Sequence, residues 1–181
     1  MVYLGYFFTA LNYIAYCCSR FFPTKLLMLF GDLIAKIFTV LGLYCLGSLS
    51  GAWGFVITFF MLIVANLKEK YHKQWLMGYV IFQGLYILVL FYYFEGISSV
   101  LVVVSLSINL ICVWFLNPQK MRFVGGLNSV LYLTYQLIIK NWAGLLELIV
   151  IYCNFMSFYK YRVNPYIRLS KSKKRIIRPL Q

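Results

Sequence analysis

The stretch "FLNPQKMRFVGGLNS", Phe115 to Ser129, interrupts an otherwise apolar chain with a proline, two cations and a pair of glycines. Proline does not continue a helix, so Pro118 predicts that one helix ends here and that another begins after a polar turn. A second copy lies nearer the N-terminus, where "FFPTKLLMLFGD" places Pro23 and Lys25 after another apolar run. These two stretches decide the predicted fold, because each joins two apolar helices in a hairpin.

The composition assigns the chain to the integral membrane proteins. Of its 181 residues, 63% are hydrophobic and only 12% are charged, whereas soluble domains are about half apolar and a quarter charged. Continuous apolar runs such as "YILVLFYYF" lack the alternation of a β-barrel, so the class is all-α. The net charge of +13 is explained by cations gathered on the cytoplasmic side of the membrane. We therefore expect the lipid bilayer as a partner, and no nucleic acid.

Seven apolar runs approach the length of about 20 residues that crosses a bilayer as a helix. With the N-terminus outside, almost all Lys and Arg residues fall on the inner side and Lys140 stays outside. The sequence therefore predicts seven spans with an outer N-terminus and a cytoplasmic C-terminus. The predicted spans are residues 2–18, 26–48, 51–66, 75–94, 97–116, 121–139 and 141–159.

The first three and the last three spans follow one pattern, which predicts an internal repeat. Pro23 and Lys25 match Pro118 and Lys120 at equal spacing, and each pair is followed by a glycine-containing helix. Two units of three helices in one orientation need a linking helix, which gives a 3+1+3 arrangement with parallel repeats. Transporters with such repeats bind solute near mid-membrane, where the repeats meet. The predicted parts are residues 1–73, the linker helix 74–96, residues 97–160 and a basic cytoplasmic tail, 161–181.

The segment "KMRFVGGLNSVLYLTYQLIIKNWAGLLELIVIYCNFMSFYKYR" resembles the YgjV-type bacterial inner-membrane proteins, with its Met-Arg helix entry and its Asn before a basic end. The 3+1+3 plan and the pair Pro118-Gln119 are similar to the PQ-loop/SWEET (MtN3-like) superfamily of small-solute transporters. The first unit departs from that pattern, with Pro23-Thr24 where Pro-Gln would stand. The resemblance implies a bacterial inner membrane location and small-solute transport, and it assigns no functional residue.

Charged side chains within the spans need a partner or a wet cavity. Asp32 and Lys36 stand one helical turn apart, which predicts an ion pair on one face of the second span. The alternative is that Asp32 lines an inner gate or takes part in proton coupling. Glu147 shares a face with Asn154, and pairing of Glu147 with the nearby Lys140 competes with a functional role.

Polar side chains form a stripe on the sixth span, which we expect to face the bundle because lipid offers amides no hydrogen-bond partner. The stripe serves either as hydrogen-bonding contact between helices or as the lining of a solute site. Asn12 and Asn109 stand at similar depth in the two units. The candidate solute-lining residues are Asn12, Asp32, Asn109, Asn128, Ser129, Tyr132, Gln136, Glu147 and Asn154.

No pattern of catalytic or metal-binding side chains appears in the sequence. His72 stands without a second ligand nearby, and the five cysteines form no CxxC motif. We therefore expect no enzyme activity, no catalytic residues, no metal and no cofactor. The run "KSKKRIIR" in the tail either binds anionic lipid headgroups or only fixes the topology. The sequence leaves open whether copies of the chain form a homo-oligomer.

Three functions compete at this point. The leading hypothesis is a small-solute transporter that works by alternating access between two three-helix units. The alternative is a scaffold or accessory subunit of a larger membrane complex, whose polar stripes only hold helices together. A third function, the substrate-binding subunit of an importer, is disfavoured by the seven spans and by the spacing of Ala10 and Ala15. A polar cavity within the bundle favours the transporter, and a bundle packed solid with apolar side chains excludes it.

Overall fold

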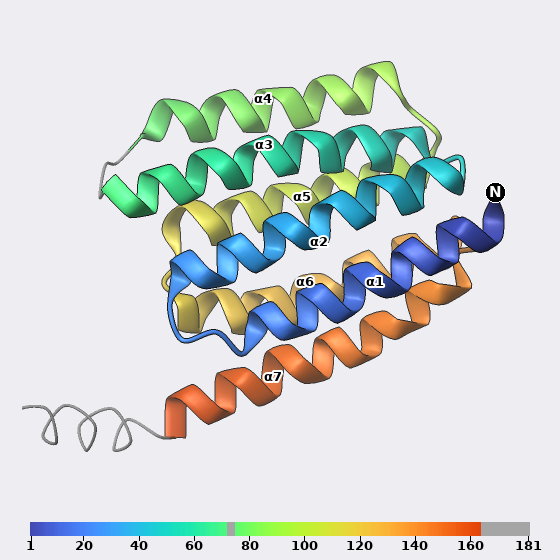
Figure 1. Cartoon of the computed structure of the whole chain (residues 1–181). Helices are drawn as coiled ribbons and strands as arrows, with labels where there is room; N and C mark the ends of the chain where they lie inside the picture. The colour runs from blue at the N-terminus through green and yellow to red at the C-terminus, as the bar shows by residue number, and fades with distance from the viewer. Residues whose placement is uncertain (72–74, 164–181) are drawn as a thin grey trace, which may run out of the picture.

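The computed structural model describes residues 1–71 and 75–163, and within these ranges it is all-helical, as predicted. The helices run antiparallel to their chain neighbours along one common direction (Figure 1). Most of the basic tail lies outside the described residues. The elements are α1 (Val2–Arg20), α2 (Lys25–Cys45), α3 (Leu49–Tyr71), α4 (Leu76–Tyr92), α5 (Ile97–Phe115), α6 (Pro118–Ile138), the 3-10 helix η1 (Trp142–Leu146) and α7 (Glu147–Val163).

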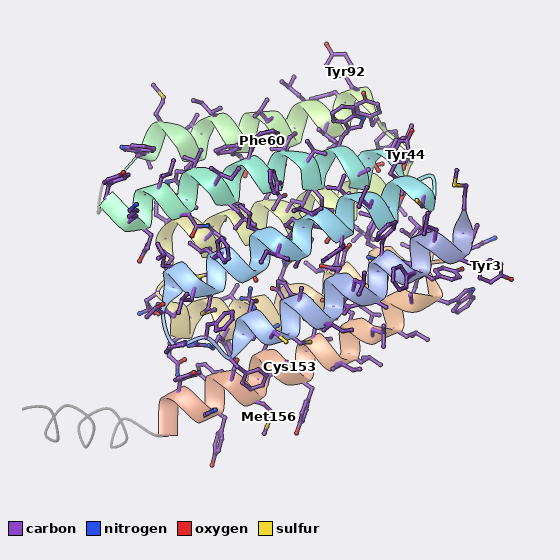
Figure 2. The ribbon with its side chains drawn as sticks, viewed as in Figure 1. Tyr3, Tyr44, Phe60, Tyr92, Cys153 and Met156 are labelled. Carbon is purple, nitrogen blue, oxygen red and sulfur yellow. The ribbon has the colours of Figure 1, made fainter. Side chains whose placement is uncertain are left out.

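The outside of the bundle suits a membrane. Four helical segments are long and apolar enough to cross one by length and composition: α2, α3, α5 and Trp142–Tyr161. Helix α4 is equally apolar and shorter. Large apolar side chains such as Phe60 and Met156 point away from the bundle (Figure 2), and Phe60 is 56% exposed. So much exposed apolar surface is unstable in water and stable against lipid.

Six of the helices form a closed ring. Around the ring, α1 packs on α2, α2 on α3, α3 on α5, α5 on α6, α6 on α7, and α7 on α1. Helix α4 packs on α3 and α5 from outside the ring and forms one edge of the molecule (Figure 1). We call the two ends of the bundle the Pro23 end, which holds the α1–α2 turn, and the Gly47 end, which holds the α2–α3 turn.

Helices α2 and α6, the middle helices of the two predicted units, begin and end alike. Both have 21 residues, and each starts with a side-chain N-cap. The Thr24 hydroxyl accepts a hydrogen bond from the Leu27 amide at 3.4 Å, and the Asn117 side chain accepts one from the Lys120 amide at 3.0 Å. The two prolines stand differently relative to these caps, because Pro23 precedes the N-cap residue Thr24 whereas Pro118 follows the N-cap residue Asn117.

At the Gly47 end, both helices stop in a left-handed residue. Gly47 has φ 79° and Lys140 has φ 55°. The amide after each one reaches back to the last full turn, from Ser48 to the Leu43 carbonyl at 3.1 Å and from Asn141 to the Gln136 carbonyl at 2.9 Å. This is the Schellman arrangement, which satisfies carbonyl groups that the helix end would otherwise leave without partners.

Small residues let α1 and α2 approach closely. A Cβ atom added at Gly31 would lie 2.6 Å from the Ser19 Cβ, and one added at Gly42 would lie 3.0 Å from the Thr9 hydroxyl oxygen. In a membrane, helix association depends on such close packing, because lipid tails are as apolar as leucine. Gly31 and Gly42 therefore allow α2 to pack directly against α1.

Candidate functional site: a polar cavity inside the helix ring

A cavity lies between the six helices of the ring, and α4 contributes nothing to its lining. The volume open to water molecules is about 50 Å³, which is room for about four waters. Each unit supplies part of the wall, and α7 contributes through Glu147. The polar side chains that line the cavity are Asn12, Tyr13, Tyr16, Arg20, Lys36, Ser105, Asn109, Asn128, Ser129, Tyr132 and Glu147.

Several buried polar atoms at the cavity have no hydrogen-bond partner within the described residues. They are the amide oxygens of Asn12 and Asn128 and the hydroxyls of Tyr13 and Tyr132. The Asn128 amide nitrogen donates to the Ser105 carbonyl at 3.0 Å, which holds the side chain in place and leaves its oxygen free. A buried polar atom without a partner costs about 1–3 kcal/mol, so these atoms require water or a polar solute in the cavity.

Asp32 pairs with Arg20 and not with Lys36, which corrects the predicted ion pair within α2. The Arg20 guanidinium forms the ion pair with the Asp32 carboxylate, and the Ser19 hydroxyl donates to the same carboxylate at 2.6 Å. Arg20 reaches Asp32 because helical side chains lean toward the helix N-terminus. Its guanidinium thus lies 4.1 Å from the centre of the Tyr16 ring, one turn back. Arg20 and Asp32 are 2% and 4% exposed.

Lys36 and Glu147 face the cavity from opposite units, and neither forms an ion pair within the described residues. The Lys36 ammonium lies 4.7 Å from the centre of the Phe55 ring and 5.3 Å from that of Tyr16, which is cation–π geometry. Glu147 is 4% exposed, and its carboxyl group faces the hydroxyls of Tyr13 and Ser129. The Tyr13 hydroxyl does not reach hydrogen-bonding geometry. The predicted competitor Lys140 is exposed on the surface.

The second unit closes the Pro23 end of the ring with hydrogen bonds to the α1–α2 turn. Arg122 donates to the carbonyl of Arg20 at 3.2 Å and to that of Phe22 at 2.7 Å. Tyr161 donates to the Phe21 carbonyl at 2.7 Å. Cationic donors are favourable at a helix C-terminus, where the carbonyl groups carry partial negative charge. Arg122 is one of the two cations that mark the α5–α6 turn in the sequence, and its side chain is buried at 2% exposure.

A separate set of hydrogen bonds closes the Gly47 end. The Asn141 amide donates to the Gln136 side-chain oxygen at 2.7 Å and to the Thr9 hydroxyl at 3.4 Å. The Tyr135 and Ser48 hydroxyls share a hydrogen bond of 2.8 Å. Both Gln136 and Asn141 are fully or almost fully buried. As at the Pro23 end, bonds run between the first and the second three-helix unit.

The structure brings six of the nine candidate residues together at the cavity: Asn12, Asn109, Asn128, Ser129, Tyr132 and Glu147. Asp32 lies behind Arg20, and Gln136 belongs to the closure at the Gly47 end. Asn154 packs on the glycines of α6, where a Cβ added at Gly125 would lie 3.4 Å from its side-chain oxygen.

Five polar residues that line the cavity were not among the predicted solute-lining residues: Tyr13, Tyr16, Arg20, Lys36 and Ser105. Arg20 stands directly before "FFPTK", outside the predicted span 2–18, and was counted only among the cytoplasmic cations. Tyrosine is common at membrane interfaces, and so the two tyrosines did not stand out from the other aromatic residues of the chain.

Comparison with known proteins gives one match. The model of the Imp-YgjV family, described as a bacterial inner membrane protein, matches residues 3–164. The match therefore covers every helix described above. No curated protein and no solved structure matches the chain significantly.

Proposed function

The chain belongs to the Imp-YgjV family of bacterial inner membrane proteins, and we propose that it carries a small polar solute across that membrane. The observation that carries the proposal is the cavity inside the ring, where buried polar atoms from both three-helix units have no hydrogen-bond partner among the residues that the structure describes. A membrane scaffold gains nothing from such atoms, since each costs free energy unless it is solvated. A transport site needs them, because they replace the water that a polar solute leaves behind.

Two units that rock against each other would open the cavity to either side in turn. If α1, α2 and α3 are replaced by α5, α6 and α7 and the reverse, the α3–α5 contact becomes the α7–α1 contact, and both contacts exist. The order of helices around the ring is therefore the same after the exchange. The matching ends of α2 and α6 support the same repeat. With α4 outside the ring as linker, these features favour the seven-span 3+1+3 plan of the PQ-loop/SWEET superfamily, with the N-terminus outside and the C-terminus cytoplasmic.

Hydrogen bonds between the units close both ends, which suits rocking. Opening the Pro23 end requires loss of the bonds from Arg122 and Tyr161, and opening the Gly47 end requires loss of Tyr135–Ser48 and Asn141–Thr9. A neutral bond contributes about 0.5–1.5 kcal/mol and a bond from the charged Arg122 about 1.5–3 kcal/mol, so the Gly47 end opens at a cost of a few kcal/mol and the Pro23 end at a higher cost. We further propose that the basic tail contacts anionic lipids, and that the protein is a carrier without catalytic residues.

Uptake of a panel of radiolabelled small solutes into proteoliposomes tests the transport function. We compare the native chain with Tyr132→Phe, which removes one hydroxyl without a partner and keeps the ring. Thr134→Val is the matched control, because Thr134 is exposed on the same helix and bonds only its own backbone. We expect uptake by the native chain and by Thr134→Val, with a loss of up to about tenfold in Tyr132→Phe.

Uptake no greater than that of protein-free liposomes for every solute in the panel would exclude transport and favour the scaffold. Uptake that is equal in Tyr132→Phe and Thr134→Val would place the route outside this cavity. The oligomeric state, measured by light scattering on the detergent complex, shows whether one ring or several make the transporting particle.

A further inference from the structure

We infer that the solute is a small zwitterion, a molecule of amino-acid size with one ammonium and one carboxylate group. The inference rests on the proposed transport function and assigns the substrate class of the same cavity. It starts from the four ionisable side chains at the site. Arg20 and Asp32 neutralise each other in an ion pair, which leaves Lys36 and Glu147 as the charges available to a solute.

Lys36 and Glu147 belong to different units and do not lie within ion-pair distance of each other. Lys36 projects from α2, and Glu147 stands at the first position of α7. A buried charge without an opposite charge is costly in a medium of low dielectric constant. The cavity thus offers one site for an anionic group and one for a cationic group, on two helices that both pack on α1.

Charge pairing selects against solutes of a single sign. An anion gains the attraction of the Lys36 ammonium and meets the repulsion of the Glu147 carboxylate, and a cation meets the reverse. A neutral solute leaves both charges without an opposite charge. A zwitterion satisfies both at once and adds no net charge to the membrane interior. The combination of one attractive and one repulsive group is what gives specificity against the single-charge analogues.

The lining between the two charges is also suited to such a solute. The amide oxygens of Asn12 and Asn128 are free to accept from an ammonium group, and the tyrosine hydroxyls of Tyr13 and Tyr132 are free to donate to a carboxylate. The cavity volume of about 50 Å³ holds about four waters and hence a solute of about four to six non-hydrogen atoms. Glycine and alanine have this size, and a hexose does not fit.

The test measures ligand-induced stabilisation of the full chain in lipid nanodiscs, since a ligand that binds only the native state raises the unfolding temperature. The probes are glycine and three smaller solutes that differ from it in charge, methylamine, acetate and acetamide. We expect glycine to stabilise the native protein with an apparent affinity at least tenfold higher than that of the other three. Lys36→Met and Glu147→Gln should each lower the affinity for glycine at least tenfold.

A gain of binding makes the test independent of any loss of stability in the variants. Glu147→Gln removes the repulsive carboxylate and should improve acetate binding over the native chain, whereas Lys36→Met should improve methylamine binding. Equal affinity for all four probes, or unchanged probe preference in both variants, overturns the inference. If glycine does not bind while another solute of the panel is taken up, the zwitterion is wrong and transport stands. Glycine binding without uptake of any solute leaves the zwitterion site standing and refutes transport.

Discussion

Replacement of Asp32 by asparagine should destabilise the protein strongly, because it leaves the Arg20 cation buried without its carboxylate. Arg20 is 2% exposed, and Lys25–Glu69 is the one other ion pair within the described residues. Removal of one partner of a buried ion pair costs about 3–5 kcal/mol. The Tyr16 ring, 4.1 Å from the guanidinium, stays in place and keeps a cation–π contact of about 0.5–2 kcal/mol. We therefore expect a loss of about 3 kcal/mol, at the lower end of that range.

Thermal unfolding in detergent, followed by tryptophan fluorescence, measures this loss. For a chain of this length, about 3 kcal/mol corresponds to a decrease of roughly 6–12 °C in Tm. Glu69→Gln is the matched control, since it removes the carboxylate of a partly exposed pair at 3.1 Å and should cost less than about 1 kcal/mol. The double variant Arg20→Met with Asp32→Asn should recover most of the stability. Equal Tm values for Asp32→Asn and Glu69→Gln would refute the reasoning.

Three further predictions follow from other contacts. Lys140 and Gly47 both have a left-handed backbone conformation, which favours glycine. Lys140→Gly should therefore raise the unfolding free energy by about 1 kcal/mol, and Gly47→Ala should lower it by about the same amount. Tm shifts of opposite sign for the two variants check this. Arg122→Gln should cost about 1.5–3 kcal/mol in the same assay, since a charged donor to the turn carbonyls is lost. The thiols of Cys17 and Cys153 face each other across the α1–α7 contact. Oxidation with copper phenanthroline should therefore join them in a disulfide, with a loss of two mass units, and stop solute uptake. Uptake that continues in the cross-linked protein contradicts rocking at this contact.

The sequence predicted the helical elements well, because apolar runs and proline turns are local signals. Pro118 begins α6 within the stretch that first marked the turn. The detailed alignment of the two units was harder to predict, since it depends on caps. Thr24 and Asn117 are both N-cap residues, and a match of prolines cannot indicate this. The matched helix ends, including Lys140 in the conformation of Gly47, depend on backbone angles that residue identity does not determine.

The cavity was only partly predictable, for a related physical reason. Helical periodicity correctly placed Asn128 and Tyr132 on one inward face, because spacing along one helix is a local property. The partner of Asp32 was wrong, since the sequence offered Lys36 on the same helix while the ion pair forms across the hairpin with Arg20. Contacts between helices depend on depth and on side-chain direction, and a single sequence does not supply these.

The charge balance of the cavity has a consequence for energetics across the membrane. With all four groups ionised, the two cations Arg20 and Lys36 and the two carboxylates Asp32 and Glu147 sum to zero. The membrane potential acts on a moving net charge with about 2.3 kcal/mol per 100 mV for each elementary charge, and these four groups carry no net charge, with or without a bound zwitterion. Transport by this protein is therefore expected to be electroneutral and to produce no current, with a direction set by the solute gradient alone.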